Sequence, residues 1–148
     1  MKRILTPLVL AFALTLTACG GTTATPTVTT DAKPAEETQT IPNLAGKWKQ
    51  SNSASEDSYQ HATITDDTIT VEWVSDGGDT TSTYWIGTFK APTDAAAPYV
   101  WSSKRDVKAT ESALLASNDD TKEFTYDGET ISYKVTALGT TTKVELKK

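Results

Sequence analysis

The stretch Thr68–Ser75, TITVEWVS, decides the fold class of this 148-residue chain. Its apolar residues Ile69, Val71 and Trp73 alternate with polar ones, and this period of two predicts a half-buried β-strand. The residues that follow, DGGD at 76–79, predict a turn, because glycine adopts the positive φ angles that tight turns demand. A strand followed by a turn is the pattern that the rest of the domain repeats.

Similar strand patterns occupy most of the sequence from residue 44 to its end. They cover residues 44–50, 59–65, 81–90, 99–101, 122–126, 130–136 and 142–146. Turn signals separate several of them, namely Asp66-Asp67, Asp127-Gly128 and Leu138-Gly139. Eight short strands joined mostly by hairpins predict an all-β fold, a small antiparallel up-and-down barrel, since closing a sheet removes its exposed edges.

Residues 103–117 break this pattern. They include Val107 and the run Ala113-Leu114-Leu115, which does not alternate. For this segment we expect one short helix, which either turns into a strand near Ser112 or plugs one end of the barrel.

Composition divides the chain into three zones. Residues 1–18 are apolar with a basic start, residues 19–43 are rich in Thr and Pro, and residues 44–148 hold all four Trp, all five Tyr and the single His. Only the third zone has the content to build a core, and about 105 residues suffice for a modest one. We therefore expect a signal peptide, a flexible tether and one β-barrel-like domain, in that order.

The first zone has the features of a secretory signal peptide. Lys2 and Arg3 make its start positive, and the apolar run 4–16 follows. At about 13 residues this run is too short for a transmembrane helix, which needs about 20. The run ends at Leu16-Thr17-Ala18-Cys19, which contains the single cysteine of the chain.

These four residues resemble the lipobox of bacterial lipoproteins. The resemblance implies that diacylglycerol is attached to the Cys19 thiol, that cleavage falls between Ala18 and Cys19, and that acyl chains such as palmitate anchor the protein. The alternative is an ordinary signal peptide followed by an unexplained free thiol. The implied location is the extracytoplasmic face of a bacterial membrane, either the cell membrane or, in a diderm cell, the outer membrane.

The second zone is predicted to be a tether. Residues 20–43 contain no aromatic residue and cannot bury enough apolar surface to fold. As a flexible chain, about 24 residues have a root-mean-square span of about 25–30 Å. Its clustered Thr and Pro are also typical acceptors of O-linked sugars, although a bare spacer is the favoured interpretation.

The charge balance limits the partners. The full chain carries a formal charge of −5, and without Lys2 and Arg3 it has 12 basic against 19 acidic side chains, a balance of −7. No run of basic residues is visible, so we expect neither nucleic-acid binding nor adhesion to anionic lipid through charge. Membrane contact is therefore expected through the lipid on Cys19.

The sequence shows no motif for catalysis. His61 is the single histidine, and no Gly-x-Ser-x-Gly elbow or His or Cys pair with metal-ligand spacing is present. Loop carboxylates at 76, 79, 119 and 120 are calcium-type ligands, but their turn positions favour a backbone role, and carboxylate pairs of the glycosidase type stay open. We expect no enzyme activity, no metal and no cofactor beyond the acyl chains.

Aromatic residues are the remaining candidates for contact with a partner or ligand, above all Trp73, Tyr84, Trp85 and Trp101. Alternation places the adjacent rings of Tyr84 and Trp85 on opposite sides of a strand. One ring is then expected to point outward or into a second layer, where it can anchor a partner. With side chains this large, the barrel is expected to be filled rather than open.

Two further resemblances concern the domain. Gly46-Lys47-Trp48 resembles the Gly-x-Trp motif of lipocalin-like barrels, in which the Trp plugs the closed end; the disulfides common in that family are absent. Trp48-Lys49-Gln50, the Ile69–Gly78 region, Tyr84-Trp85 and residues 112–117 also resemble small membrane lipoproteins encoded by phages and prophages of Gram-positive bacteria.

Together these features predict a non-enzymatic, membrane-anchored lipoprotein that acts through protein contact at the cell envelope. The phage resemblance implies superinfection exclusion by a prophage, with an envelope or phage protein as partner. A lipocalin-like carrier of a small ligand is the alternative.

Overall fold

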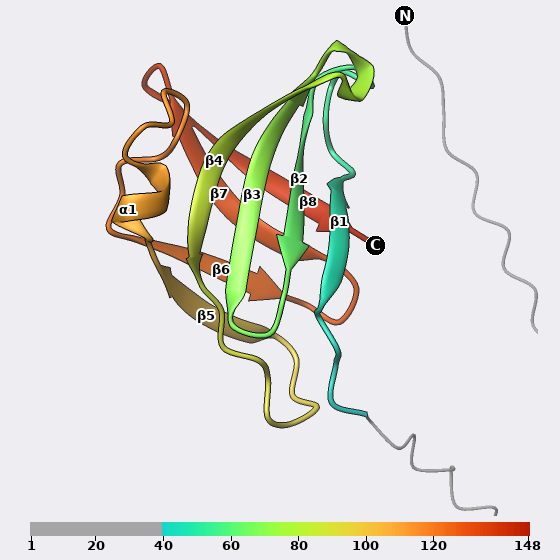
Figure 1. The fold of residues 1–148 in the computed structure, drawn as a ribbon. Helices are drawn as coiled ribbons and strands as arrows, with labels where there is room; N and C mark the ends of the chain where they lie inside the picture. Colours follow the sequence, from blue (N-terminus) through green and yellow to red (C-terminus); the bar gives the residue numbers. More distant parts are fainter. Residues whose placement is uncertain (1–39) are drawn as a thin grey trace, which may run out of the picture. The chain divides into compact units, whose positions relative to one another are not determined.

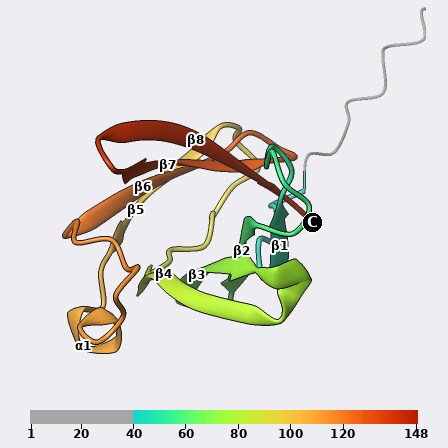
Figure 2. The ribbon, with the colours of Figure 1, turned by 90° about the horizontal axis from the view of Figure 1, so that it is seen from above.

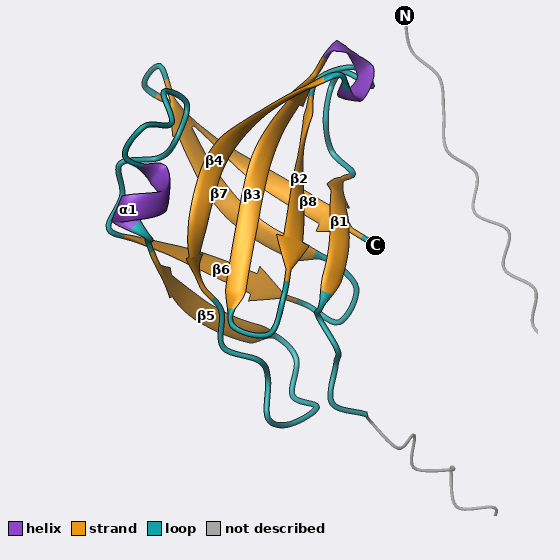
Figure 3. Cartoon of the chain, in the orientation of Figure 1, coloured by secondary structure: helices purple, strands orange, loops and turns teal. Residues whose placement is uncertain are grey.

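The computed structural model describes residues 40–148, which form an all-β fold of eight antiparallel strands in a nearly closed barrel (Figure 1). The strands are β1 (Gly46–Gln50), β2 (Tyr59–Ile64), β3 (Thr68–Ser75), β4 (Thr80–Thr88), β5 (Tyr99–Lys104), β6 (Thr121–Tyr126), β7 (Ile131–Ala137) and β8 (Thr140–Lys147). Helical structure in this part is limited to α1 (Val107–Thr110) and a 3₁₀ turn, Asp76–Gly78 (Figure 3). The fold class predicted from the sequence is confirmed.

The strand order is β4-β3-β2-β1-β8-β7-β6-β5. Two four-stranded meanders are therefore joined through the pairing of β1 with β8, in which Lys49 lies opposite Lys147 and Gln50 opposite Leu146. Seen from above, the meanders form two facing layers around the core (Figure 2). The β7–β8 turn is made by Leu138 at φ 51° and Gly139 at φ 76°.

The barrel has a seam between β4 and β5, where Gly87 of β4 forms an isolated bridge with Arg105, the residue after β5. The chain after β5 runs along this open edge and supplies hydrogen-bond donors to it. The amide of Asp106 donates to the carbonyl of Ile86 at 2.8 Å, and the amide of Ser117 to that of Tyr84 at 2.9 Å. We call residues 105–117 the strap, because it covers an edge that would otherwise pair with another chain.

The short helix expected within residues 103–117 is present as α1, but the two expectations for its continuation and position are wrong. β5 continues to Lys104, α1 is a single turn capped by the Asp106 side chain, and no strand forms near Ser112. The helix also lies beside β4 rather than at a barrel end (Figures 1 and 2). The reason is that the carbonyls at the β4 edge need donors, and the irregular strap provides them without adding a ninth strand.

Aromatic rings fill the barrel interior. A continuous row, with neighbouring ring centroids 5.0–6.4 Å apart, is formed by Tyr99, Trp101, Phe124, Tyr133, Tyr84 and Trp73. Rings at these spacings contribute about 0.5–1.5 kcal/mol per pair beyond the burial of their area. The row crosses from the β5–β8 layer to the β1–β4 layer and holds the two together.

Tyr84 and Trp85 are both buried, with exposed fractions of 4% and 0%. The alternation rule, which predicted opposite faces for these neighbours, is wrong here. The register between β3 and β4 shifts after Val71, which faces Trp85, so that the next residue of β3 faces Thr83 and Tyr84 is left without a partner. This β-bulge brings both rings to the interior.

Trp48 lies near the end of the barrel where the chain enters β1. It is 3% exposed, its indole Nε1 donates to the carbonyl of Leu44 at 2.8 Å, and its ring packs edge-on against Tyr126. Gly46, the other residue of the Gly-x-Trp motif, has a φ of 120°. No helix in residues 40–148 is long and apolar enough to cross a membrane.

We predict that Gly87→Ala destabilises the fold. A β-carbon at this position would lie 2.5 Å from Ser103 Oγ and 2.6 Å from the carbonyl oxygen of Lys104, and that backbone atom cannot move without opening the seam. Overpacking of this kind costs about 1–3 kcal/mol. Urea unfolding measures the loss, and Ser102→Ala on the exposed face of β5 is the control. Equal stability of the two variants would contradict this account of the seam.

Candidate functional site

The residues singled out from the sequence fall into two groups. Ala18 and Cys19 lie outside the described residues. The four aromatic candidates line the interior: Tyr84, Trp85 and Trp101 are at most 5% exposed, and Trp73 is half-buried with its ring edge-on to Tyr84. These four rings pack against the core. Their low exposure therefore does not support the expected contact with a partner on the outer surface.

Several polar side chains are buried among the rings. The hydroxyl of Tyr133 donates to Gln60 Oε1 at 2.6 Å, and Trp85 Nε1 donates to Ser103 Oγ at 3.0 Å, which links β4 to β5 across the seam. Burial raises the pKa of the Tyr133 hydroxyl well above its ordinary value, and Tyr84 adds to this shift. These bonds orient the core and leave Gln60 Nε2 unpaired among the described residues.

Lys122 is a buried cation at the edge of this core. Its side chain is 5% exposed, and Nζ lies 5.2 and 5.3 Å from the ring centroids of Tyr84 and Trp85. Nζ donates to Asp119 Oδ2 at 2.8 Å. This bond, aided by one from Ser117 Oγ, lowers the pKa of the Asp119 carboxyl. Asp119, a calcium candidate by sequence, thus serves as the partner of a buried lysine.

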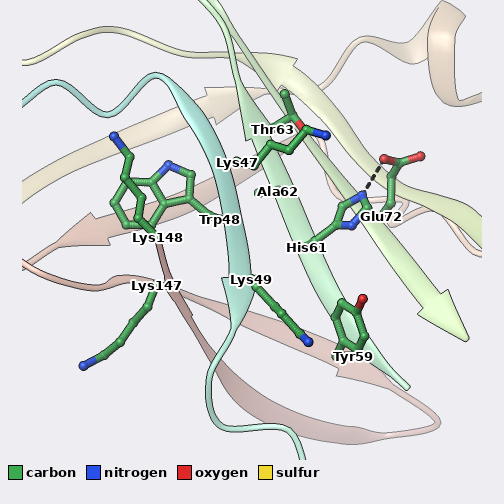
Figure 4. A pocket seen from close by; sticks show the side chains of 10 residues that line it. All are labelled: Lys47, Trp48, Lys49, Tyr59, His61, Ala62, Thr63, Glu72, Lys147 and Lys148. Atoms are coloured by element: carbon green, nitrogen blue, oxygen red, sulfur yellow. Dashed lines mark hydrogen bonds and ion pairs between the residues drawn. The ribbon is translucent and has the colours of Figure 1, made fainter. Parts of the chain in front are cut away.

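The outer surface carries a different feature, a group of four exposed lysines that we call the lysine face. Lys47 and Lys49 come from β1, and Lys147 and Lys148 from the end of β8 and beyond it. They line a hollow of about 360 Å³ together with residues of β2 and β3 (Figure 4). Within the hollow His61 Nε2 lies 2.8 Å from Glu72 Oε2.

The amines of the lysine face spread over the surface and do not converge on one point. Lys49 Nζ lies 4.3 Å from the ring centroid of Tyr59, whereas Lys147 and Lys148 extend on the other side of β1 (Figure 4). Lys147 Nζ is 3.2 Å from Glu129, and Lys148 Nζ donates to the carbonyl of Asn43 at 2.8 Å. Such an arrangement suits an extended anionic surface better than a single small ion.

The register between β1 and β8 makes the clustering of these lysines unfavourable for the stability of the sheet. Lys49 and Lys147 are directly opposite each other on paired strands, a position in which like charges destabilise a sheet. The sequence shows no run of basic residues because the two lysine pairs are about 100 residues apart, and the fold brings them to one hollow. The available signal was Lys-x-Lys in the first expected strand and Lys-Lys at the end of the last one, which meet when a barrel closes.

Residues 40–148 contain no group of three or more His, Cys, Asp or Glu side chains that could hold a metal ion. His61 is hydrogen-bonded to Glu72 on the partly exposed outer face of β2 and β3. We find no match to this chain among protein-family models, curated proteins or solved structures. Function therefore has to be inferred from the residues and their geometry.

We predict that Asp119→Asn destabilises the fold at neutral pH, because Lys122 then loses the carboxylate that compensates its burial. Asp119 is 61% exposed, so solvent screening limits the loss to about 1 kcal/mol. Because folding lowers the Asp119 pKa, this contribution is present above the unfolded pKa and is lost as the pH falls through the folded one. The deficit of the variant should therefore shrink towards about pH 3.

Urea unfolding of the wild type and of Asp119→Asn, at neutral pH and at about pH 3, measures the loss of stability in the variant. Asp120→Asn changes the neighbouring carboxylate, for which the structure gives no side-chain bond, and is the matched control. A deficit of the same size at both pH values would show that the Asp119 carboxylate does not act through its charge.

Proposed function

We propose that this chain is a non-enzymatic lipoprotein, anchored through Cys19 to the extracytoplasmic face of a bacterial membrane, that acts through protein contact at the envelope. The lipobox-like Leu16–Cys19 and the Thr- and Pro-rich stretch 20–43 support the anchor and the tether. A prophage-encoded role in superinfection exclusion is the specific form of this proposal, supported by the resemblance to phage lipoproteins.

The observation that carries the proposal is the filled interior. Rings of both layers occupy the space in which a lipocalin-like carrier would hold its ligand, and the row from Tyr99 to Trp73 leaves no break between them. A small-molecule pocket needs about 300 Å³ of concave, mostly apolar space. The lysine-lined hollow is of that size, but it lies among charged side chains on the outer face. Contact through the outer surface is thus favoured over the carrier alternative.

The proposed location at the membrane explains how contact with another protein could exclude a phage. A tether of about 25–30 Å keeps the domain close to the membrane, where an entering phage must deliver its DNA. There, an anchored domain meets the injection proteins at a high effective concentration, so that weak contact is sufficient. This supports a binding role that needs no catalytic group.

We predict that expression of the wild-type chain in a sensitive host reduces plaque counts of related phages, and that Cys19→Ala abolishes the protection. The physical reason is that loss of the acyl chains removes the domain from the membrane. Plaque counts and incorporation of labelled palmitate measure function and anchoring separately.

Thr22→Ala, which leaves the lipobox-like residues intact, is the matched control and should retain both properties. Equal plaque counts for the wild type and an empty vector would contradict the exclusion role. Absence of palmitate from the wild type would contradict the anchor.

A further inference from the structure

We infer that the lysine face docks the domain onto the anionic phospholipid headgroups of the membrane that carries it. This inference rests on the proposed lipid anchor and adds a second, electrostatic contact with the same membrane. Its starting point is the pairing of β1 with β8, which places Lys49 opposite Lys147 and brings them with Lys47 and Lys148 to one hollow, in a chain whose formal charge is −5.

The position of the lysine face relative to the tether favours a membrane. Lys148 Nζ bonds to the carbonyl of Asn43, and its Cε lies 4.0 Å from where a β-carbon on Gly46 would be. The chain that leads back towards Cys19 therefore leaves the domain beside Lys148. A tether attached there brings this side of the domain to the lipid surface first.

The spread of the amines favours headgroups over a single phosphate. The side chains of Lys49 and Lys147 point to different sides of β1 and do not converge on one small ion, whereas a lipid surface presents phosphates to each (Figure 4). Each lysine near an anionic surface adds a modest attraction, and the tether supplies the local concentration that makes such attraction effective.

Two carboxylates lie near the four lysines of the lysine face and reduce its positive charge without cancelling it. Glu129 pairs with Lys147 at 3.2 Å and is itself 80% exposed, and Glu72 is held by His61. The remaining surface of this acidic domain is repelled by anionic lipid. Attraction on one side and repulsion elsewhere together fix the orientation, so that the lysine face alone approaches the membrane.

Lysine reactivity tests the docking. The full, acylated chain is reconstituted in vesicles of phosphatidylcholine alone or of phosphatidylcholine with phosphatidylglycerol, and a membrane-impermeant amine-acylating reagent is added. Mass spectrometry then gives the rate at each lysine. We expect acylation of Lys47, Lys49, Lys147 and Lys148 to slow several-fold on the anionic vesicles and to recover at about 0.5 M NaCl, where charge interactions are screened within about 5 Å.

Exposed lysines elsewhere provide internal controls, because Lys104 and Lys108 lie beside the seam and should react equally on both vesicles. A variant with Lys47→Gln, Lys49→Gln and Lys147→Gln keeps Lys148 as a reporter, and its protection should disappear. The matched variant with Lys104→Gln, Lys108→Gln and Lys134→Gln loses the same charge from other exposed sites and should keep the protection.

The outcomes separate this inference from the proposed anchor. A chain that fails to float with either vesicle contradicts the anchor. A chain that floats, but whose lysine face reacts equally on both vesicles, overturns the docking alone. Equal protection by soluble glycerol phosphate on neutral vesicles would assign the lysines to a free phosphate and overturn the membrane assignment. Protection that persists in high salt would show that the contact is not electrostatic and would overturn the docking as well.

Discussion

The pairing of β1 with β8 is the constraint on which the rest of the domain depends. It is short, with two registered residue pairs and a further bond from the amide of Ser51 to the carbonyl of Glu145 at 2.8 Å. Yet it joins residues about 100 positions apart and converts two local meanders into one sheet that wraps the aromatic core. Closing so long a loop has an entropic cost, which the buried rings of both layers must offset.

The seam lies at the other end of the strand order, where closure is incomplete. There the strap donates hydrogen bonds to backbone carbonyls at the β4 edge, and the Trp85–Ser103 bond joins β4 to β5. Gly87 allows the close approach, because any side chain would meet the backbone of Lys104. Direct strand pairing holds the β1–β8 side of the barrel, and side chains with an irregular segment hold the opposite side.

Local patterns in the sequence were sufficient to predict the eight strands and most turns, since alternation and Asp-Gly or Leu-Gly signals act over a few residues. The bulge at Tyr84 escaped prediction because it depends on register against β3, which no single strand encodes. The lysine face escaped it for a similar reason, since Lys49 and Lys147 meet only after closure. The cleavage and lipidation sites lie outside the described residues, so they stay predictions from the sequence.

The entry of the chain at β1 has a mechanical consequence for the proposed anchor. Residues 40–45 continue away from the beginning of β1 (Figure 1). If Cys19 is anchored as proposed, any force between it and a partner bound elsewhere on the domain must pass through this five-residue strand. Because β1 is flanked by β2 and β8, a pull along its axis loads the hydrogen bonds on both sides in shear and engages them together, so that the strand does not peel away one bond at a time. One of the internal strands of the barrel thus connects it to the preceding chain.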